Sequence, residues 1–217
     1  MTRFVIIRHG ETQWNLEGRY MGHLDSPLSA LGELQAKRLA ERCSSISFDA
    51  LYSSDLGRAA STAWFIGREC RKEVLFDQGL RERNMGIFEG LTVTEMNLRY
   101  PNERAEYERV GESYIIPSGE SAAQRIAIAL QCLDKLATRH LNETVVVVTH
   151  GGVLMGLFES VLGLPFGSAD RYRRLNAAWN VFSRESDRWI LEAWGDVAHL
   201  ETIETAFVPN QSTDPAA

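Results

Sequence analysis

The sequence predicts one three-layer α/β/α sandwich around a mostly parallel central sheet. Short apolar runs that suit buried parallel strands alternate with helical patterns from Phe4 to Leu162. No internal repeat or low-complexity linker divides the 217 residues, and 44% of them are hydrophobic, so one large core can form. We therefore expect a single domain over residues 1–205 and a disordered tail over residues 206–217.

The first part of the chain predicts strands that each lead into a helix. The apolar run Phe4 to Ile7 ends at polar residues, as a buried strand that enters a loop does. Ser29 can cap a helix whose apolar residues recur at helical spacing. These residues are Leu31, Leu34, Leu39 and Cys43. A strand at Ala50 to Ser53, a helix at Leu56 to Cys70 and a strand at Val74 to Phe76 follow.

The irregular, charged segment over residues 78–119 predicts a lid over a site. Within it we expect a short helix at Thr94 to Tyr100, which Pro101 ends. The pattern does not predict the conformation of the rest of the lid.

The remainder of the chain predicts further strands and helices. The helix over Ala122 to Ala137 has one apolar face, and the strand at Val145 to Val148 follows it. Another apolar helix opens at Gly151 and ends at Leu164-Pro165. Two alternating segments, Trp179 to Phe182 and Trp189 to Ala193, predict a late antiparallel pair at a sheet edge.

Charge and hydropathy exclude several functional classes. The formal net charge of −6 disfavours a general binder of nucleic acid or anionic membranes, because those surfaces recruit positive charge. No stretch approaches the ~18 apolar residues of a membrane helix, and the chain begins without the apolar core of a signal peptide. We therefore expect a cytoplasmic protein. Cys43, Cys70 and Cys132 have neither disulfide nor zinc spacing and are expected to be reduced.

Two histidines follow predicted strands at the edge of the sheet where ligands bind. His9 stands between Arg8 and Gly10 on an expected solvated loop, and His150 precedes Gly151 and a second glycine at a helix start. A lone histidine after a strand is more often structural than catalytic. Here, glycine permits close backbone approach, and free N–H groups at a helix start favour an anion. The two strand ends together predict an anion site.

Six motifs in this order resemble the histidine phosphatase superfamily, which has the phosphoglycerate-mutase-like fold, up to about Leu200. The lid motif and the chain ending at Gly195-Asp196 to His199-Leu200 are most similar to the bacterial branch known as probable phosphoglycerate mutases, many of whose relatives are phosphatases. The motifs are Arg8-His9-Gly10-Glu11-Thr12 with Trp14-Asn15, Asp25-Ser26-Pro27-Leu28-Ser29 with Gly32, Ser53-Ser54-Asp55-Leu56-Gly57-Arg58, Leu80-Arg81-Glu82 with Asn84-Met85-Gly86, Gly119-Glu120-Ser121, and Thr149-His150-Gly151-Gly152.

The resemblance implies a role for each central residue. His9 would attack phosphorus and become a phosphohistidine, while Arg8 and Arg58 would clamp the phosphoryl oxygens. His150 would stabilise the transition state, and Glu82 would be first the general acid and then the base that activates water. The positive charge that magnesium often supplies would come from the two arginines and a protonated His150, so neither a metal nor a nucleotide cofactor is expected.

Further residues are implied as phosphate or substrate contacts. Asn15, Gly151 and Gly152 would add neutral hydrogen bonds. Met21 stands where relatives of this branch usually have glutamine, and it cannot donate a hydrogen bond, so it would contribute shape and could favour a less polar substrate. His23 would lie at the rim. The remaining implied contacts are Gly10, Thr12, Gly22, Arg83, Asn84 and Met85.

Three functions are weighed. The leading hypothesis is a hydrolase of small phosphorylated metabolites, and the alternative is a phosphoglycerate mutase. Mutases resemble one another in a longer lid with paired arginines and a proline-rich stretch, which this chain lacks between Glu82 and Gly119. A non-catalytic phospholigand-binding module is the remote third. Apolar helices such as Val153 to Leu162 could bury inside the domain or against a partner, which leaves a homodimer open.

Overall fold

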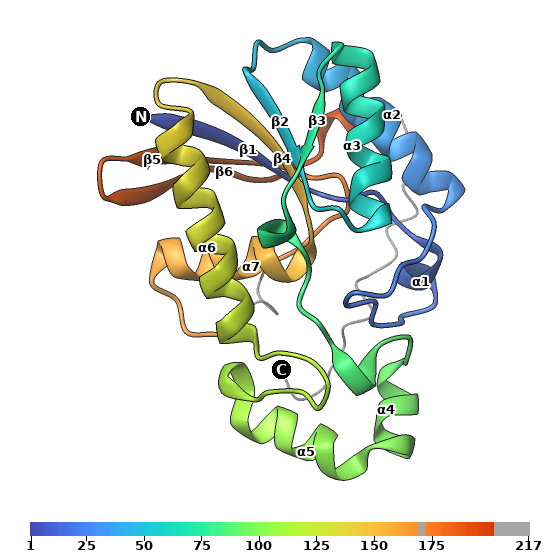
Figure 1. The fold of residues 1–217 in the computed structure, drawn as a ribbon. Helices are drawn as coiled ribbons and strands as arrows, with labels where there is room; N and C mark the ends of the chain where they lie inside the picture. Colours follow the sequence, from blue (N-terminus) through green and yellow to red (C-terminus); the bar gives the residue numbers. More distant parts are fainter. Residues whose placement is uncertain (169–171, 202–217) are drawn as a thin grey trace.

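The computed structural model describes residues 1–168 and 172–201, and its centre is a six-stranded sheet (Figure 1). The strand order is β3-β2-β4-β1-β5-β6. The first four strands are parallel to one another, β5 is antiparallel to its neighbour β1, and β6 is antiparallel to β5. The mostly parallel sheet and the late antiparallel pair are therefore confirmed. The strands are β1 (Thr2–Arg8), β2 (Ala50–Ser53), β3 (Val74–Phe76), β4 (Thr144–Thr149), β5 (Trp179–Glu185) and β6 (Arg188–Asp196).

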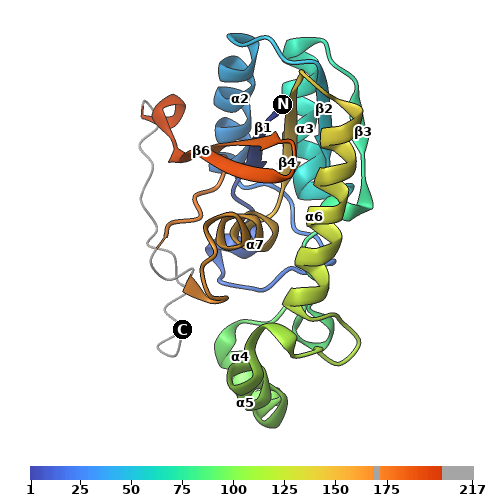
Figure 2. The same cartoon turned by 90° about the vertical axis from the view of Figure 1, so that its left-hand side faces the viewer.

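Helices cover both faces of this sheet and make the three layers. The helices α2 (Ala30–Ser44) and α3 (Gly57–Cys70) cover one face, and α6 (Ala122–Arg139) and α7 (Gly151–Leu162) cover the other (Figure 2). In β1, alternate residues enter the two cores, which explains why its apolar run is continuous.

Burial corrects one sequence prediction and bears on another. Leu34 was expected on the apolar face of α2, but it is 38% exposed. The buried face of that helix instead runs through Ala36, Leu39 and Cys43, which are spaced at three and four residues. The apolar residues of α7 from Val153 to Phe158 are buried within this chain, whereas Leu162 at its end is 46% exposed. The tail expected over 206–217 lies outside the described residues.

The lid projects from one end of the sandwich and has a small core of its own (Figures 1 and 2). It holds α4 (Val93–Arg99), near the predicted bounds, and α5 (Pro101–Val110), which the sequence analysis missed. Pro101 does not stop helix formation here. It occupies the first position of a new helix, where its missing N–H is not needed. The lid core consists of Met85, Phe88, Leu91, Met96 and Ile116.

Short elements complete the connections. The lid is tied to the loop before Met21 by two backbone bonds, from Tyr20 N to Leu91 O (3.0 Å) and from Gly90 N to Tyr20 O (2.7 Å). This contact brings the lid beside the carboxyl ends of the central strands. The short helices are α1 (Gln13–Leu16), η1 (Gln78–Leu80), η2 (Gly86–Phe88), η3 (Gly111–Ser113) and η5 (Ala198–Leu200).

Two expectations about chemistry can be compared with the structure. All three cysteines are free, and burial raises the pKa of the Cys132 thiol to about 12 and that of Cys43 further still, so both thiols are protonated at neutral pH. Within residues 1–168 and 172–201, no helix has the length and apolar character needed to cross a membrane.

Candidate active site

The two predicted histidines meet at one edge of the sheet. β1 and β4 are neighbouring parallel strands with Arg8 opposite Thr149, so the residue after each strand emerges at the same level. The ring centroids of His9 and His150 lie 5.3 Å apart, and His9 N donates to Thr149 O at 3.0 Å. His9 is only 2% exposed, so the expected solvated loop is wrong: the strand pairing continues one residue further and buries the ring.

His9 is held as a neutral ring with one free nitrogen. Burial, together with the charges of Arg58 and Arg8, lowers the pKa of His9 well below its ordinary value. Nδ1 lies 2.7 Å from the carbonyl oxygen of Gly10. A carbonyl only accepts, so Nδ1 carries the proton and Nε2 keeps its lone pair. This tautomer is the one that a nucleophile requires.

His150 is fully buried and also neutral in the absence of ligand. Burial is the largest reason that its pKa lies well below the ordinary value, and Arg58 adds to it. The protonated His150 expected from the sequence concerns phosphoryl transfer with phosphate bound, so it stays a prediction. Nε2 contacts the hydroxyl of Ser54 at 2.8 Å, and Leu56 N already donates to that oxygen at 3.3 Å. This arrangement favours a proton on Nδ1, where it could be donated to a ligand.

Arg58 and Arg8 bring two guanidinium groups to the site. Arg58 is 1% exposed, and its terminal nitrogens donate to Gly22 O at 2.8 Å and Leu24 O at 2.9 Å. Arg8 donates to Arg174 O. Burial lowers the pKa of Arg8 to about 10, so it still carries its charge at neutral pH. Both charges act on His9 and on His150, which locates all four groups in one cluster.

Three buried N–H donors in this cluster have no partner among residues 1–168 and 172–201. They are Arg8 Nε, Arg58 Nε and His150 Nδ1. Buried donors are almost always satisfied, and those that are not call for an absent water or ion. An anion with several acceptor oxygens would satisfy all three at once. The geometry therefore supports the anion site that the two strand ends predict.

Glu82 is held on the same side by backbone N–H groups. Its carboxylate accepts from Gly152 N at 2.9 Å and from Arg83 N at 2.8 Å. A Cβ at position 152 would lie 2.3 Å from Glu82 Oε1, so a larger residue there would displace the carboxylate. The Gly152 amide was expected to bind phosphate, but here it fixes the carboxylate. His23 donates from Nε2 to Glu82 O at 3.0 Å and so packs against the same residue.

The first loop positions its residues through a short helix cap. Thr12 and Asn15 form a reciprocal capping box at the start of α1, and the Thr12 hydroxyl also donates to Met21 Sδ at 3.4 Å. Gly10 was expected to let the backbone approach a ligand. A Cβ there would lie 2.6 Å from the carbonyl oxygen of Gly32, so packing against α2 is what requires this glycine.

The predicted lid residues contact the lid instead of the histidines. Arg83 lies against the ring of Tyr107, 5.2 Å from its centroid, and donates to its hydroxyl at 2.7 Å. Met85 is buried in the lid core. Asn84 Oδ1 accepts from Gly86 N at 2.9 Å and stabilises the turn. The direct substrate contacts expected of Arg83, Asn84 and Met85 therefore remain predictions.

Sequence reasoning missed several residues that support the site. Thr62 Oγ1 accepts from Gly10 N at 3.0 Å and donates to Arg58 O at 2.9 Å, which ties the two loops together. Ser54 belongs to one of the motifs but has no predicted role, although its hydroxyl contacts His150. Asn176 has no predicted role either, although its side chain contacts His9 and Asn15. Hydroxyl and amide side chains are common in loops, so type alone gave no signal.

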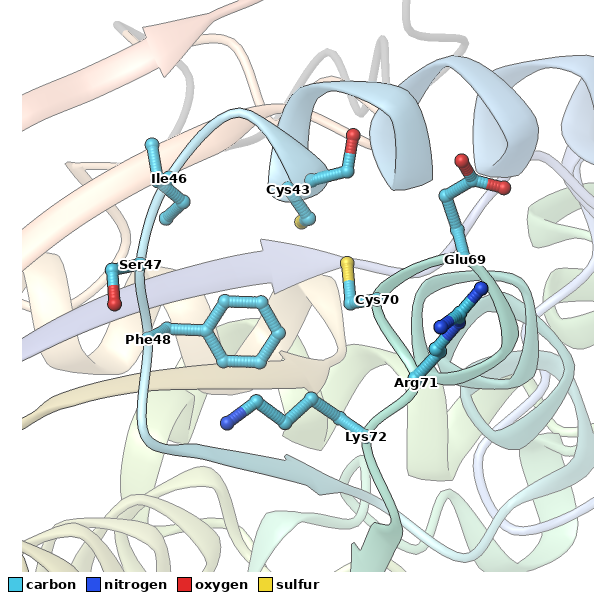
Figure 3. A pocket seen from close by; sticks show the side chains of 9 residues that line it. Cys43, Ile46, Ser47, Phe48, Glu69, Cys70, Arg71 and Lys72 are labelled. Carbon is cyan, nitrogen blue, oxygen red and sulfur yellow. The ribbon is translucent and has the colours of Figure 1, made fainter.

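A separate cavity lies away from these residues. Within the part of the chain that the structure describes, no group of three or more His, Cys, Asp or Glu residues could hold a metal ion. Figure 3 presents a cavity of about 320 Å³ between the end of α2, with the loop that follows it, and the end of α3. It lies at the amino ends of β2 and β3, opposite to the edge that carries His9. This cavity is therefore not the candidate active site.

Comparison with known proteins agrees with the geometry. The family model of the histidine phosphatase superfamily (branch 1) matches residues 4–197. The chain belongs to this superfamily. The sequence resemblance is thereby confirmed, and with it the expectation that the chain is an enzyme of the phosphatase and mutase group.

Relatives in the histidine phosphatase superfamily carry both phosphatase and mutase names. Arabidopsis thaliana phosphoglycerate mutase-like protein 4 is 40% identical over 94% of this chain and 88% of its own. The metal-independent phosphoserine phosphatase of the same plant is 35% identical, with 94% and 85% covered. Probable phosphoglycerate mutase GpmB of Shigella boydii is 34% identical, with 93% and 96% covered. A mycobacterial glucosyl-3-phosphoglycerate phosphatase structure has a TM-score of 0.78 at 31% identity, with 90% and 99% covered.

Proposed function

We propose that this protein hydrolyses small phosphomonoesters through a phosphohistidine on His9 and needs no metal ion. One observation carries the proposal: a neutral His9 with a free Nε2 stands beside the three buried donors without partners in the described part of the chain, Arg8 Nε, Arg58 Nε and His150 Nδ1. A phosphoryl group has the charge and the equatorial oxygens that these donors require. Glu82 supplies the proton transfers.

The first step transfers the phosphoryl group to the protein. His9 Nε2 forms a bond to phosphorus while the bond from phosphorus to the ester oxygen breaks. Glu82, entering as the carboxylic acid, gives its proton to the departing alkoxide. Arg8 and Arg58 bind the equatorial oxygens, where negative charge spreads in the transition state, and His150 donates from Nδ1.

The second step restores the enzyme. A water molecule attacks phosphorus, and the bond from phosphorus to His9 Nε2 breaks. The Glu82 carboxylate takes a proton from that water and becomes the acid again. Inorganic phosphate leaves, and His9 returns to its neutral form with the proton still on Nδ1. No external oxidant, metal or nucleotide takes part.

Hydrolysis is favoured over phosphoglycerate mutation by the lid. A mutase must hold a bisphosphate and needs a second cluster of cations. The arginines of α5 are already paired with carboxylates: Arg104 with Glu108 at 2.8 Å, and Arg109 with Glu106 at 2.6 Å. Arg83 is engaged by Tyr107. One relative is named as a metal-independent phosphatase, in line with the metal-free mechanism.

The test is phosphate release in the presence of a chelator from a panel that includes phosphoserine, 3-phosphoglycerate and nitrophenyl phosphate. Conversion of 3-phosphoglycerate to 2-phosphoglycerate is followed in parallel. We expect metal-free release without interconversion. Interconversion that depends on a bisphosphate primer would make the protein a mutase. Absence of both activities would favour the phospholigand-binding module and overturn the proposal.

The nucleophile is tested separately with His9→Ala. This variant removes the only nitrogen that the mechanism makes covalent, so we expect no turnover and no acid-labile labelling by a ³²P substrate. Circular dichroism and thermal melting establish that the variant is folded. Phosphate release by a folded His9→Ala protein would contradict the phosphohistidine assignment.

A further inference from the structure

A segment far along the chain runs beside the end of β1. Within residues 174–177, Arg174 O accepts from the guanidinium of Arg8, and Ala177 N donates to Arg8 O at 3.0 Å. Ala177 is fully buried and has a φ of +54°, a left-handed conformation that alanine rarely adopts. Such strain persists only where the surroundings fix the backbone. Asn176, between these two contacts, is therefore held in a defined position.

The side chain of Asn176 joins two groups of the candidate active site. Its Nδ2 donates to His9 O at 2.9 Å and to Asn15 Oδ1 at 3.3 Å. Because both partners are acceptors, the amide nitrogen must face them. The same Asn15 oxygen also accepts from Thr12 N at 3.1 Å.

These contacts determine which end of the Asn15 amide faces the site. Both lone pairs of Asn15 Oδ1 are occupied, by Thr12 N from one direction and by Asn176 Nδ2 from another. The amide cannot flip without losing both bonds. Its NH₂ group, with two donors, is the end that makes no hydrogen bond to a described residue. Without Asn176, a flip of the amide would cost only the bond from Thr12 N.

We propose that Asn176 is a positioning residue, which orients the Asn15 amide as a donor to the phosphoryl group and holds the backbone of His9. The inference rests on the proposed function. Asn176 itself does not touch the substrate. Its effect on turnover therefore passes through Asn15 and His9, and substitution of Asn15 removes most of that effect.

The chain offers a matched control in Asn180 of β5. Its Nδ2 donates to Ile6 O at 3.0 Å, which is a carbonyl of β1, and its Oδ1 accepts from Gly195 N at 2.8 Å. Asn180 is buried and lies three residues before His9 in strand register. Asn180→Ala therefore removes a similar bond from an amide side chain to a backbone carbonyl without touching the site.

The experiment is a double-mutant cycle measured as kcat/KM for nitrophenyl phosphate. We expect Asn176→Ala to lower kcat/KM by about tenfold or more, and by less than about threefold when Asn15→Ala is already present. Asn176→Asp keeps the shape but loses the donors, so it should lose at least as much activity. Asn180→Ala should lower the melting temperature while kcat/KM stays within about twofold.

Two results would overturn the proposal. One is an unchanged kcat/KM in Asn176→Ala, and the other is the same fold loss with and without Asn15. Wild-type protein that releases no phosphate would instead overturn the proposed function. In that case binding of inorganic phosphate, measured by calorimetry, replaces kcat/KM in the same cycle, and the same two patterns decide the role of Asn176.

Discussion

Replacing Gly152 by alanine should separate the proton transfer assigned to Glu82 from the rest of the reaction. The new Cβ would lie 2.3 Å from Glu82 Oε1 and 3.1 Å from Cδ, whereas ordinary contact begins at 3.4 Å. The carboxylate must therefore retreat by about 1 Å, and the 2.9 Å bond from Gly152 N is strained or lost. A displacement of that size in a reacting group costs about 100-fold in rate.

The assay compares kcat/KM for two leaving groups, because kcat/KM reports the steps up to formation of the phosphoenzyme. An alkyl phosphate needs the proton of Glu82 and should lose about 100-fold in Gly152→Ala. Nitrophenyl phosphate leaves without protonation and should lose much less. Gly156→Ala on the same helix α7 is the control, because its Cβ would instead meet Ile126 Cγ1 of α6 at 2.3 Å. Equal losses on both substrates, or the same selective loss in Gly156→Ala, would refute the role of Glu82.

Three further predictions concern Glu82 and Arg58 in the site and His199 in η5. Glu82→Gln keeps the acceptor for Gly152 N but cannot give up a proton, so single-turnover burst kinetics should slow for alkyl phosphates far more than for nitrophenyl phosphate. The lysine in Arg58→Lys cannot replace the paired guanidinium donors to two loop carbonyls. Calorimetry should therefore show that inorganic phosphate binds at least tenfold more weakly, and unchanged binding would contradict the role of Arg58 in holding the phosphoryl oxygens. Burial lowers the pKa of His199 in the folded protein from 6.5 to about 4. Between these two pH values the unfolded chain binds a proton on His199 that the folded protein does not, so the free energy of unfolding falls as the pH drops from 6.5 toward 4. Urea midpoints should fall less between pH 7 and pH 5 in His199→Gln, and an equal fall would exclude His199 as a source.

The fold was predictable where one short-range rule determines each element. The apolar run of β1 could be identified because both of its faces are buried, and α2 because Ser29 caps it, with its side chain accepting from Gly32 N at 2.9 Å. Pro101 misled the prediction because the same residue can end one helix and begin the next. Leu34 fits helical spacing from Leu31 but points away from the sheet, and only the packing of α2 on α3 determines which stripe is buried.

The candidate site was predictable in its residues but not in their partners. His9 and His150 could be paired because parallel strands deliver their ends to one edge. Asn176 lies 167 positions from His9 and contacts it through a side chain that no local pattern singles out. The sequence shows a glycine at positions 10 and 152, but it does not show which atoms a Cβ would meet there. At Gly10 they are the backbone of Gly32, and at Gly152 they are the carboxylate of Glu82, so one is a packing requirement and the other sets the position of the proposed acid.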